Sequence, residues 1–529
     1  MNLRTLVRIA LCSALAAGLA GCGGGGGAGG GGDGGARVAL SGTVTYDRVP
    51  NAANGRLDYG AIASRPVRGA TVEALAAGSA QPLGSATTDD SGHYAMELPA
   101  GSRITVRVRA QMTRSGQGGT WDVTVRDNTR GGPIYAMESP EFSPDGPSSQ
   151  RDLHAPSGWT GASYGEQRTS APFAILDTVY RDIAKVRGTA SATDFPALRL
   201  YWSPDNTPTS GRIAQGQIGT TSFTMDSQGS AIYVLGKENV DTDEFDESVI
   251  SHEWGHYYQS NFSRDDSLGG SHSTQDRLDP RVAFSEGWGN AWSGMALERS
   301  TYTDSMGARQ SLATFVNLDA TVSNPGWFRE SSVHTTLWRI YQQYGFDPIH
   351  RVFTGPLRQT PALVTIHAFA AAYGSVQPAG AATLASILSS QGISGATNDP
   401  WAGAESNNGG VDGVLPIYVR ASTGSAQTAC VRNAAGTYNK LGNTAFLRYS
   451  IAQAGRYQVS VNGPGGTDPD LAVFGPSGEL ASALAVGTGD SLSAVLPAGD
   501  IVVAVTDANL PAPAASQSVT VSCLQVTLN

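Results

Sequence analysis

No other stretch of the sequence limits the possible folds of this chain as strongly as His252-Glu253-Trp254-Gly255-His256. If it is helical, His252 and His256 lie at i and i+4, one above the other on the same face. Two imidazoles in that relation can bind one Zn²⁺ without any adjustment of the backbone. Glu253 lies one step round the helix, where it can take a proton from a zinc-bound water. The motif therefore predicts a helix with two metal ligands and a general base.

The residues around the motif favour a buried helix over a chance match. An acidic first turn, which suits a helix N-terminus, is supplied by Asp243, Glu244, Asp246 and Glu247. The apolar side chains at helical spacing are Phe245, Val249, Ile250, Trp254 and Tyr257. Two histidines and a glutamate would be costly to bury in such a helix unless a metal paired them.

A third ligand is expected, because a catalytic zinc site takes three protein ligands and keeps one position open. In the next strongly apolar segment, residues 281–292, Glu286 and Asn290 again lie at i and i+4. A carboxylate in such a run is rarely just a solvated charge. We therefore predict that Glu286 is the third ligand and that the side-chain oxygen of Asn290 accepts the free ring N–H of His252.

The pattern His252-Glu253-x-x-His256 followed by Glu286 resembles the glutamate-ligand zinc metallopeptidases (gluzincins), in particular the fungalysin and thermolysin-like families. The resemblance covers roughly residues 171–415. It implies an α+β zincin-type catalytic domain, one catalytic Zn²⁺ and the hydrolysis of peptide bonds. Glu253 would act as general base and then as the acid that protonates the leaving amine.

Two departures from those families concern residues near the ligands. The families usually carry Asp where this chain has Asn290, so the partner of His252 is neutral here. They also place a Tyr between the two metal helices, whereas the sequence has none between Gln259 and Glu286. His272, in a Gly-rich loop of that interval, is a candidate substitute for the Tyr.

Two further roles are implied by the same resemblance. The segment 332–335 resembles the thermolysin-like segment whose His hydrogen-bonds the developing oxyanion, which carries that catalytic role to His334. A purely structural histidine is the alternative. An apolar strand is predicted at 231–235, directly before the metal helix. In zinc peptidases of this type an edge strand there pairs with the substrate backbone, and we expect the same here.

The first 22 residues resemble a bacterial lipoprotein signal. Residues 1–21 combine two early arginines with an apolar stretch at 9–19 that is too short for a stable membrane span. The resemblance implies cleavage before Cys22 and stable anchoring by lipid on it; ordinary secretion with Cys22 incidental is the alternative. Residues 22–36 are a Gly-rich tether. Gly23 after Cys22 is like lipoproteins sent to the outer membrane or cell surface of two-membrane bacteria.

Alternating apolar and polar residues predict a β-sandwich on each side of the catalytic domain. Residues 37–138 resemble a carboxypeptidase-regulatory-like module, and residues 418–529 resemble the bacterial pre-peptidase C-terminal domain. The segment 139–170 is rich in Pro, Gly and Ser and is predicted as a linker, with irregular structure packed on the catalytic domain as the alternative. The expected fold is therefore multidomain, an α+β core flanked by two sandwiches.

The cysteines agree with export. Cys12 leaves with the signal and Cys22 takes the lipid, which leaves Cys430 and Cys523 in the last domain. In an oxidising compartment these two should form a disulfide.

Composition narrows the possible partners. The formal net charge of −10 over 529 residues does not suggest the excess of positive charge that nucleic-acid binding needs. The expected partners are a protein or peptide substrate and a membrane reached through the N-terminal lipid; the oligomeric state stays open. The predicted function is an exported, lipid-anchored zinc endopeptidase. The alternative is a catalytically impaired zincin-fold surface lipoprotein that acts as a binding or adhesion module, favoured by Asn290 and the missing Tyr.

Overall fold

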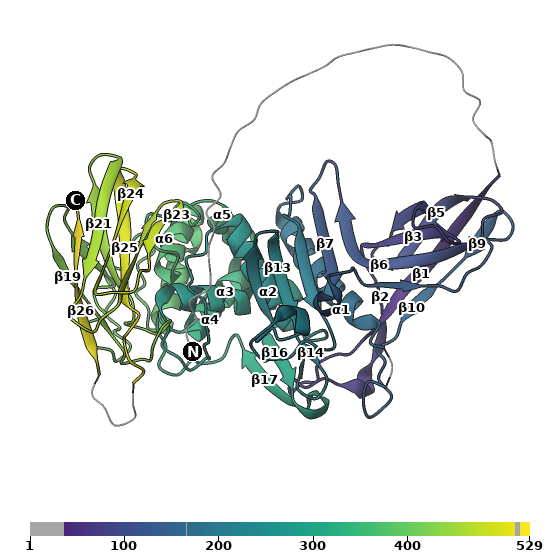
Figure 1. Ribbon diagram of the computed structural model, residues 1–529, viewed down its shortest axis with the longest axis horizontal. Helices are drawn as coiled ribbons and strands as arrows, with labels where there is room; N and C mark the ends of the chain where they lie inside the picture. Colours follow the sequence, from purple (N-terminus) through teal and green to yellow (C-terminus); the bar gives the residue numbers. More distant parts are fainter. Residues whose placement is uncertain (1–35, 166, 514–518) are drawn as a thin grey trace, which may run out of the picture.

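The computed structural model describes residues 36–165, 167–513 and 519–529. The predicted signal (1–21), Cys22 with its predicted lipid, and the predicted tether up to residue 35 lie outside the described residues. In the described part, the strands β1 and β9 lie at one end, the helices α2, α3 and α4 in the middle, and the strands β19 and β26 at the other end (Figure 1). This arrangement confirms a β-rich, multidomain chain. Among the described residues, no helix is both long enough and apolar enough to cross a membrane.

The N-terminal part is built on β1 (Arg37–Arg48), a long strand with several partners. It pairs antiparallel with β5 (His93–Pro99) and β2 (Ala63–Pro66), and parallel with β9 (Ser148–Gln150) and β10 (Leu153–Ala155). A second sheet supplies the opposite layer with β3 (Ala70–Ala76), β4 (Pro82–Thr87), β6 (Ile104–Arg114) and β8 (Ala136–Glu138). In β6 alternate residues are buried, as the sequence pattern predicts.

Within residues 139–170, for which the sequence predicts a linker, the described segment 148–159 packs against this N-terminal part. Strands β9 and β10 both pair with β1. The ring of Trp159 stacks on Tyr59 with centroids 3.7 Å apart. The sequence does not predict these strands, because each is only three residues long, shows no sustained period and lies in a Pro- and Gly-rich segment.

The sheet that contains β3, β4, β6 and β8 continues past the predicted boundary between the N-terminal module and the region predicted to be catalytic (residues 171–415, the catalytic region). Its strand order is β12-β13-β11-β7-β6-β3-β4. Strand β7 (Trp121–Arg126) pairs antiparallel with β6 and parallel with β11 (Leu198–Trp202), in a register that sets Leu198 beside Val123. Helix α1 (Ser170–Thr189) begins the catalytic region and buries Ile175, Val179 and Ile183. The module and the catalytic region therefore share one backbone hydrogen-bond network.

The free edge of this sheet differs from the predicted one. Strand β13 (Gly229–Val234) covers most of the predicted stretch 231–235, but it lies between β11 and β12 (Ser222–Asp226). Strand β12 precedes β13 in the chain and is joined to it by a turn at 227–228. It runs antiparallel to β13 and is the end strand of the sheet. The prediction that 231–235 is the edge strand is wrong, because the partly exposed strand β12 gives a weak sequence pattern and covers its outer side.

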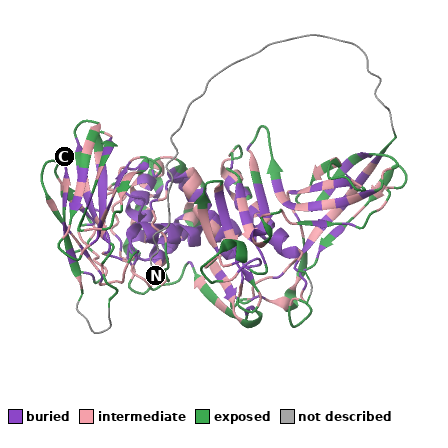
Figure 2. Cartoon of the chain, in the orientation of Figure 1, coloured by how far each residue is buried: buried purple, intermediate pink, exposed green. Residues whose placement is uncertain are grey.

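The helices pack in the middle of the molecule, where Figure 2 shows an almost continuous buried region. They are α2 (Glu247–Phe262), α3 (Pro280–Leu297), α4 (Glu330–Tyr344), α5 (Asp347–Thr354), α6 (Ile366–Val376) and α7 (Ala381–Ser390). Helix α3 starts at Pro280, and the Asp279 side chain accepts a hydrogen bond from Arg281 N. It is buried along its whole length, as its uniformly apolar sequence requires.

Helices α2 and α3 approach each other closely because glycines face each other between them. A Cβ on Gly289 would lie 2.8 Å from the His252 ring, and one on Gly255 would lie 3.2 Å from the Gly289 Cα. Trp254 and Trp292 stack beside this contact with centroids 5.1 Å apart. A small sheet borders α2 and contains β14 (Gly236–Lys237), β15 (Asp241–Thr242), β16 (Thr301–Met306) and β17 (Leu312–Asn317).

The C-terminal part is a sandwich of two sheets. One has the order β18-β20-β25-β22-β23, with β18 (Tyr418–Ala421), β20 (Ala445–Ile451), β25 (Gly499–Asp507), β22 (Pro469–Gly475) and β23 (Gly478–Ala483). The other has the order β19-β26-β21-β24, with β19 (Gln427–Arg432), β26 (Val521–Leu528), β21 (Gly455–Asn462) and β24 (Gly489–Leu496). Cys430 and Cys523 are directly opposite on β19 and β26 and form the predicted disulfide, which is confirmed.

Candidate metal centre

Helices α2 and α3 bring the three predicted ligand side chains to one point. His252 Nε2 lies 3.0 Å from His256 Nε2 and 3.3 Å from Glu286 Oε2. His256 Nε2 lies 3.5 Å from the same carboxylate oxygen. The three side chains are at most 12% exposed. The i, i+4 spacing of the histidines places both rings on one face of α2, and the facing helix supplies the carboxylate.

The far ring nitrogens are held by neighbours from α3. His252 Nδ1 lies 3.1 Å from Asn290 Oδ1, as the sequence predicts for Asn290, and His256 Nδ1 lies 3.2 Å from Ser285 Oγ. Because the Asn290 oxygen can only accept, the proton of a neutral His252 ring is on Nδ1 and the Nε2 lone pair faces the centre. Two imidazole nitrogens and a carboxylate oxygen that face one point are the donor set of a catalytic zinc site, so the residues fit Zn²⁺.

The pKa shifts of the ligand side chains His256 and Glu286 agree with a metal site. Burial alone would lower the pKa of His256, but the Glu286 and Glu253 carboxylates outweigh it and raise that pKa to about 9. Burial opposes ionisation of Glu286, but the facing histidines hold its pKa well below the usual value. The pocket formed by these side chains therefore favours a positive charge at its centre.

Glu253 lies between the ligands and the free edge of the large sheet. Its Oε2 accepts a hydrogen bond of 2.7 Å from the backbone N–H of Phe223 on β12. That N–H consequently points away from β13, toward the outer side of the edge strand. The side chain predicted as general base thus lies where a peptide strand added to β12 would run.

The structure brings three further residues to the site, His272, Glu330 and Tyr302, of which the sequence pointed only to His272, as a candidate substitute for the missing Tyr. His272 Nε2, on the loop between α2 and α3, lies 3.3 Å from Glu286 Oε2 and 3.4 Å from Glu330 Oε2. Tyr302 of β16 packs its ring 5.8 Å from the His252 ring. The Gly-rich loop around His272 was the only sequence signal for the first contact; the other two depend on α4 and β16 folding back onto the ligands.

His334 is a buried residue of α4. It is 1% exposed, and its Nδ1 has no hydrogen-bond partner among the described residues. Burial lowers its pKa to about 3, so the ring stays neutral. The α4 side chain that joins the contacts around Glu286, through His272, is Glu330, one helical turn earlier. The oxyanion role of His334 remains a prediction.

The acidic residues before the motif bind neighbouring segments rather than the N-terminus of α2. Glu244 pairs with Arg168 at 2.6 Å, and Glu247 pairs with Arg48 at 2.8 Å. Asp246 makes no side-chain cap, and its Oδ2 accepts the Ser305 N–H at 3.1 Å. These contacts fix the start of α2 against the N-terminal module and β16. The sequence pattern located the helix correctly but for a different physical reason.

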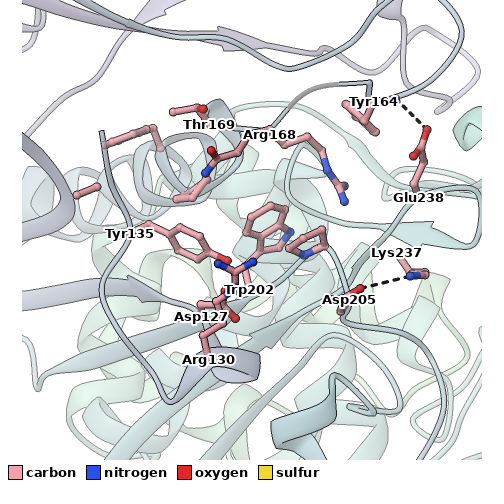
Figure 3. Close-up of a pocket in the computed structure, with 15 residues that line it drawn as sticks. Asp127, Arg130, Tyr135, Tyr164, Arg168, Thr169, Trp202, Asp205, Lys237 and Glu238 are labelled. Atoms are coloured by element: carbon pink, nitrogen blue, oxygen red, sulfur yellow. Dashed lines mark hydrogen bonds and ion pairs between the residues drawn. The ribbon is translucent and has the colours of Figure 1, made fainter. Parts of the chain in front are cut away.

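A cavity of about 630 Å³ lies elsewhere, at the carboxyl ends of the parallel strands β7, β11 and β13 (Figure 3). Its lining includes Trp202 and Arg168, and ion pairs or hydrogen bonds such as Lys237–Asp205 close its rim. None of the residues that line it is a predicted ligand or catalytic residue. The metal centre and this cavity are therefore separate features of the fold.

Comparisons with known proteins add little to this geometry. No protein-family model matches the chain, and no curated protein matches it. Among solved structures, the pre-peptidase C-terminal domain of a Bacillus anthracis collagenase is 11% identical over 21% of this chain and 94% of that chain, with a TM-score of 0.17. CorA, a surface-associated copper-binding protein of Methylomicrobium album BG8, is 8% identical over 21% of this chain and 98% of that chain, with a TM-score of 0.16.

The periplasmic lysozyme inhibitor PliG of Salmonella Typhimurium is 13% identical over 21% of this chain and 98% of that chain, with a TM-score of 0.13. At these TM-scores the likenesses carry no argument about fold or activity. The case for the function therefore rests on the geometry of the site.

Proposed function

We propose that this chain is an exported, lipid-anchored zinc endopeptidase that hydrolyses peptide bonds. The observation that carries the proposal is the meeting of His252 Nε2, His256 Nε2 and Glu286 Oε2 within 4.8 Å of one another, with Glu253 on the next position of the same helix. In this proposal residues 171–415 are the zincin-type catalytic domain. Residues 37–138 and 418–529 are the carboxypeptidase-regulatory-like and pre-peptidase C-terminal-like modules.

The ligand residues would hold one Zn²⁺, which when bound lowers the pKa of a water molecule and polarises a carbonyl group. Glu253 takes the proton of the attacking water and gives it to the leaving amine. Asn290 holds the His252 ring in the orientation and tautomer that a ligand needs, through the 3.1 Å contact at Nδ1.

The substrate would lie along β12 as an added antiparallel strand. In an antiparallel edge strand, alternate residues turn both backbone groups outward, so the outward N–H of Phe223 implies the same for Met225. A peptide paired there passes directly over Glu253, and substrate binding must replace the Phe223–Glu253 hydrogen bond. Pairing along an end strand suits an endopeptidase, which binds substrate residues on both sides of the scissile bond.

The test is a chelator-controlled digest of a mixed peptide library by the purified protein. The proposal expects cleavage that is lost with chelator and restored by Zn²⁺. If the protein holds zinc but cleaves nothing, the alternative of a catalytically impaired surface lipoprotein that binds rather than hydrolyses takes its place. The neutral Asn290 is the feature that favours this alternative.

Anchoring is tested separately, through Cys22→Ser. The variant should be exported but soluble, with unchanged activity per molecule, because Cys22 lies far along the chain from the site residues. Wild-type protein that takes up no palmitate analogue and remains in the soluble fraction would leave plain secretion as the answer.

A further inference from the structure

The loop 268–272 between the two metal helices is held by the C-terminal sandwich. Its backbone carbonyls accept hydrogen bonds from the segment 438–440, which lies between β19 and β20. Tyr438 Oη donates to Leu268 O at 3.0 Å. Asn439 Nδ2 donates to Gly269 O at 2.9 Å and to Ser271 O at 3.1 Å. One side-chain amide thus spans the carbonyls on both sides of Gly270.

The fit between the two segments is close, and Asn439 is its buried part, whereas Tyr438 is 59% exposed. Asn439 is 1% exposed. Gly270 has a φ of 94°, and a Cβ there would lie 2.4 Å from the Tyr438 ring, so the ring rests directly on the loop backbone. Lys440 Nζ donates to Ser271 O at 2.8 Å and pairs with Asp276 at 3.3 Å. The two hydrogen bonds from the buried Asn439 amide, together with those from Tyr438 and Lys440, hold the loop backbone in one conformation.

The next residue of the loop is His272, and its position follows from these contacts. Its Nδ1 lies 3.1 Å from Gly270 O, while its Nε2 lies between Glu286 Oε2 and Glu330 Oε2. The neighbours on both ring nitrogens are acceptors, so His272 presents an N–H on the metal-site side. The side chain is 27% exposed, which leaves it open to a bound substrate.

We propose that the segment 438–440 of the C-terminal sandwich is a positioning element of the active site. It holds His272 so that its N–H donates to the carbonyl oxygen of the scissile peptide as negative charge develops there. Asn439 acts through His272 and is a positioning residue. The inference rests on the proposed peptidase function and deepens it, since it makes the C-terminal sandwich a part of the machinery rather than a removable module.

The test compares three single variants and one double variant of the full exported chain. His272→Ala should lower kcat about 100-fold, the scale of one lost oxyanion donor. Asn439→Ala should lower kcat at least about tenfold, with KM and zinc content unchanged, because β12 and the three ligands are intact. The double variant should remain within about threefold of His272→Ala, since Asn439 has no effect except through that ring.

The matched control is Asn433→Ala. Asn433 is 2% exposed and makes two hydrogen bonds to backbone groups, Pro511 O and Thr520 N, within the same sandwich. Its loss should leave kcat unchanged even if thermal stability falls. Lys440→Met serves where Asn439→Ala does not fold, and it should reduce kcat in the same direction.

A readout that needs no activity separates this inference from the peptidase proposal. Amide hydrogen exchange in peptides that cover 266–275 should be faster in Asn439→Ala than in wild type and unchanged in Asn433→Ala. Unchanged exchange in Asn439→Ala overturns the inference. So does an active wild type whose Asn439→Ala variant keeps full kcat, or a double variant in which the two losses multiply. A wild type that cleaves nothing, with the exchange difference present, overturns the peptidase proposal while the positioning contact stands.

Discussion

The backbone N–H of Phe223 donates a 2.7 Å hydrogen bond to the carboxylate of Glu253, which ties the edge strand of the large sheet to the metal-site helix. One contact thus joins the surface where a peptide could pair and the group that would move the proton. A carboxylate that accepts a backbone N–H is held in place before substrate arrives.

Glu253→Gln should strongly reduce turnover without removing the metal. The amide is nearly isosteric and its oxygen can still accept the Phe223 N–H, but it cannot take the proton of a water molecule. We expect zinc content equal to wild type and kcat lower by about 10²–10⁴-fold. Elemental analysis and peptide hydrolysis on the same preparation check this, and a variant that keeps wild-type kcat would remove Glu253 from the mechanism.

His252→Ala or Glu286→Ala should remove the metal. Wild type is expected to hold about one Zn²⁺ per chain, and each variant close to none. The zinc-dependent rise in melting temperature should vanish with it, because a ligand stabilises the folded state by mass action. The control is His367→Ala, which breaks a buried 2.8 Å histidine–glutamate pair with Glu405 away from the site. Equal zinc in wild type and His252→Ala would refute the ligand assignment.

Asn290→Asp should tighten zinc binding. A carboxylate at this position accepts the His252 N–H more strongly and makes the ring a better ligand, and we expect the zinc Kd to fall about tenfold. Without metal the same variant should be less stable, because Asn290 is 6% exposed and the new charge is buried. Competition with a chelator measures the affinity, and thermal unfolding in chelator measures the stability. Weaker zinc binding than wild type contradicts the prediction.

Asp182 should make stability fall as pH rises. It is fully buried on α1, where Trp292 Nε1 donates to it at 3.0 Å, and burial raises its pKa to about 8. The unfolded carboxyl titrates near about pH 4. Between these values the folded chain keeps a proton that the unfolded chain has lost, so its stabilisation is complete below about pH 4 and is lost as pH rises through the folded pKa.

The comparison is between wild type and Asp182→Asn, whose amide oxygen still accepts the Trp292 N–H. The melting temperature of wild type should drop more steeply between pH 5 and pH 8 than that of the variant, since one such group changes the free energy of unfolding by up to about 1.4 kcal/mol per pH unit. Parallel curves for the two proteins would show that Asp182 is ionised in the folded state.

The sequence was informative about contacts along one helix and much less about contacts between distant segments. The i, i+4 spacings placed His252 beside His256 on one helix and Glu286 beside Asn290 on the next, because helix geometry fixes which residues share a face. The meeting of the two pairs was predicted from the need of a catalytic zinc for a third ligand. No such rule identifies the neighbour of a strand. A period-2 pattern reads the same in a closed sandwich and in an extended sheet, so the pairing of β7 with β11 could not be predicted.

The same limit applies to the loops around the site. His272 contacts Glu286 from a loop whose carbonyls accept hydrogen bonds from the segment 438–440, more than 150 residues further on. On α4, His334 is buried with no hydrogen-bond partner on Nδ1 among the described residues, and Glu330, one turn earlier, is the side chain that contacts His272. Tertiary packing decides both, and neither leaves a local pattern.

The continuous sheet has a consequence for anyone who expresses the catalytic region by itself. A fragment that begins at residue 171 loses β7, and with it every backbone partner of one side of β11 between Leu198 and Tyr201. Without β7, strand β11 would expose a row of unpaired N–H and C=O groups, to which a second copy of the fragment could pair. Such a fragment should aggregate in an edge-to-edge manner, whereas a fragment that begins at residue 36 keeps that edge covered.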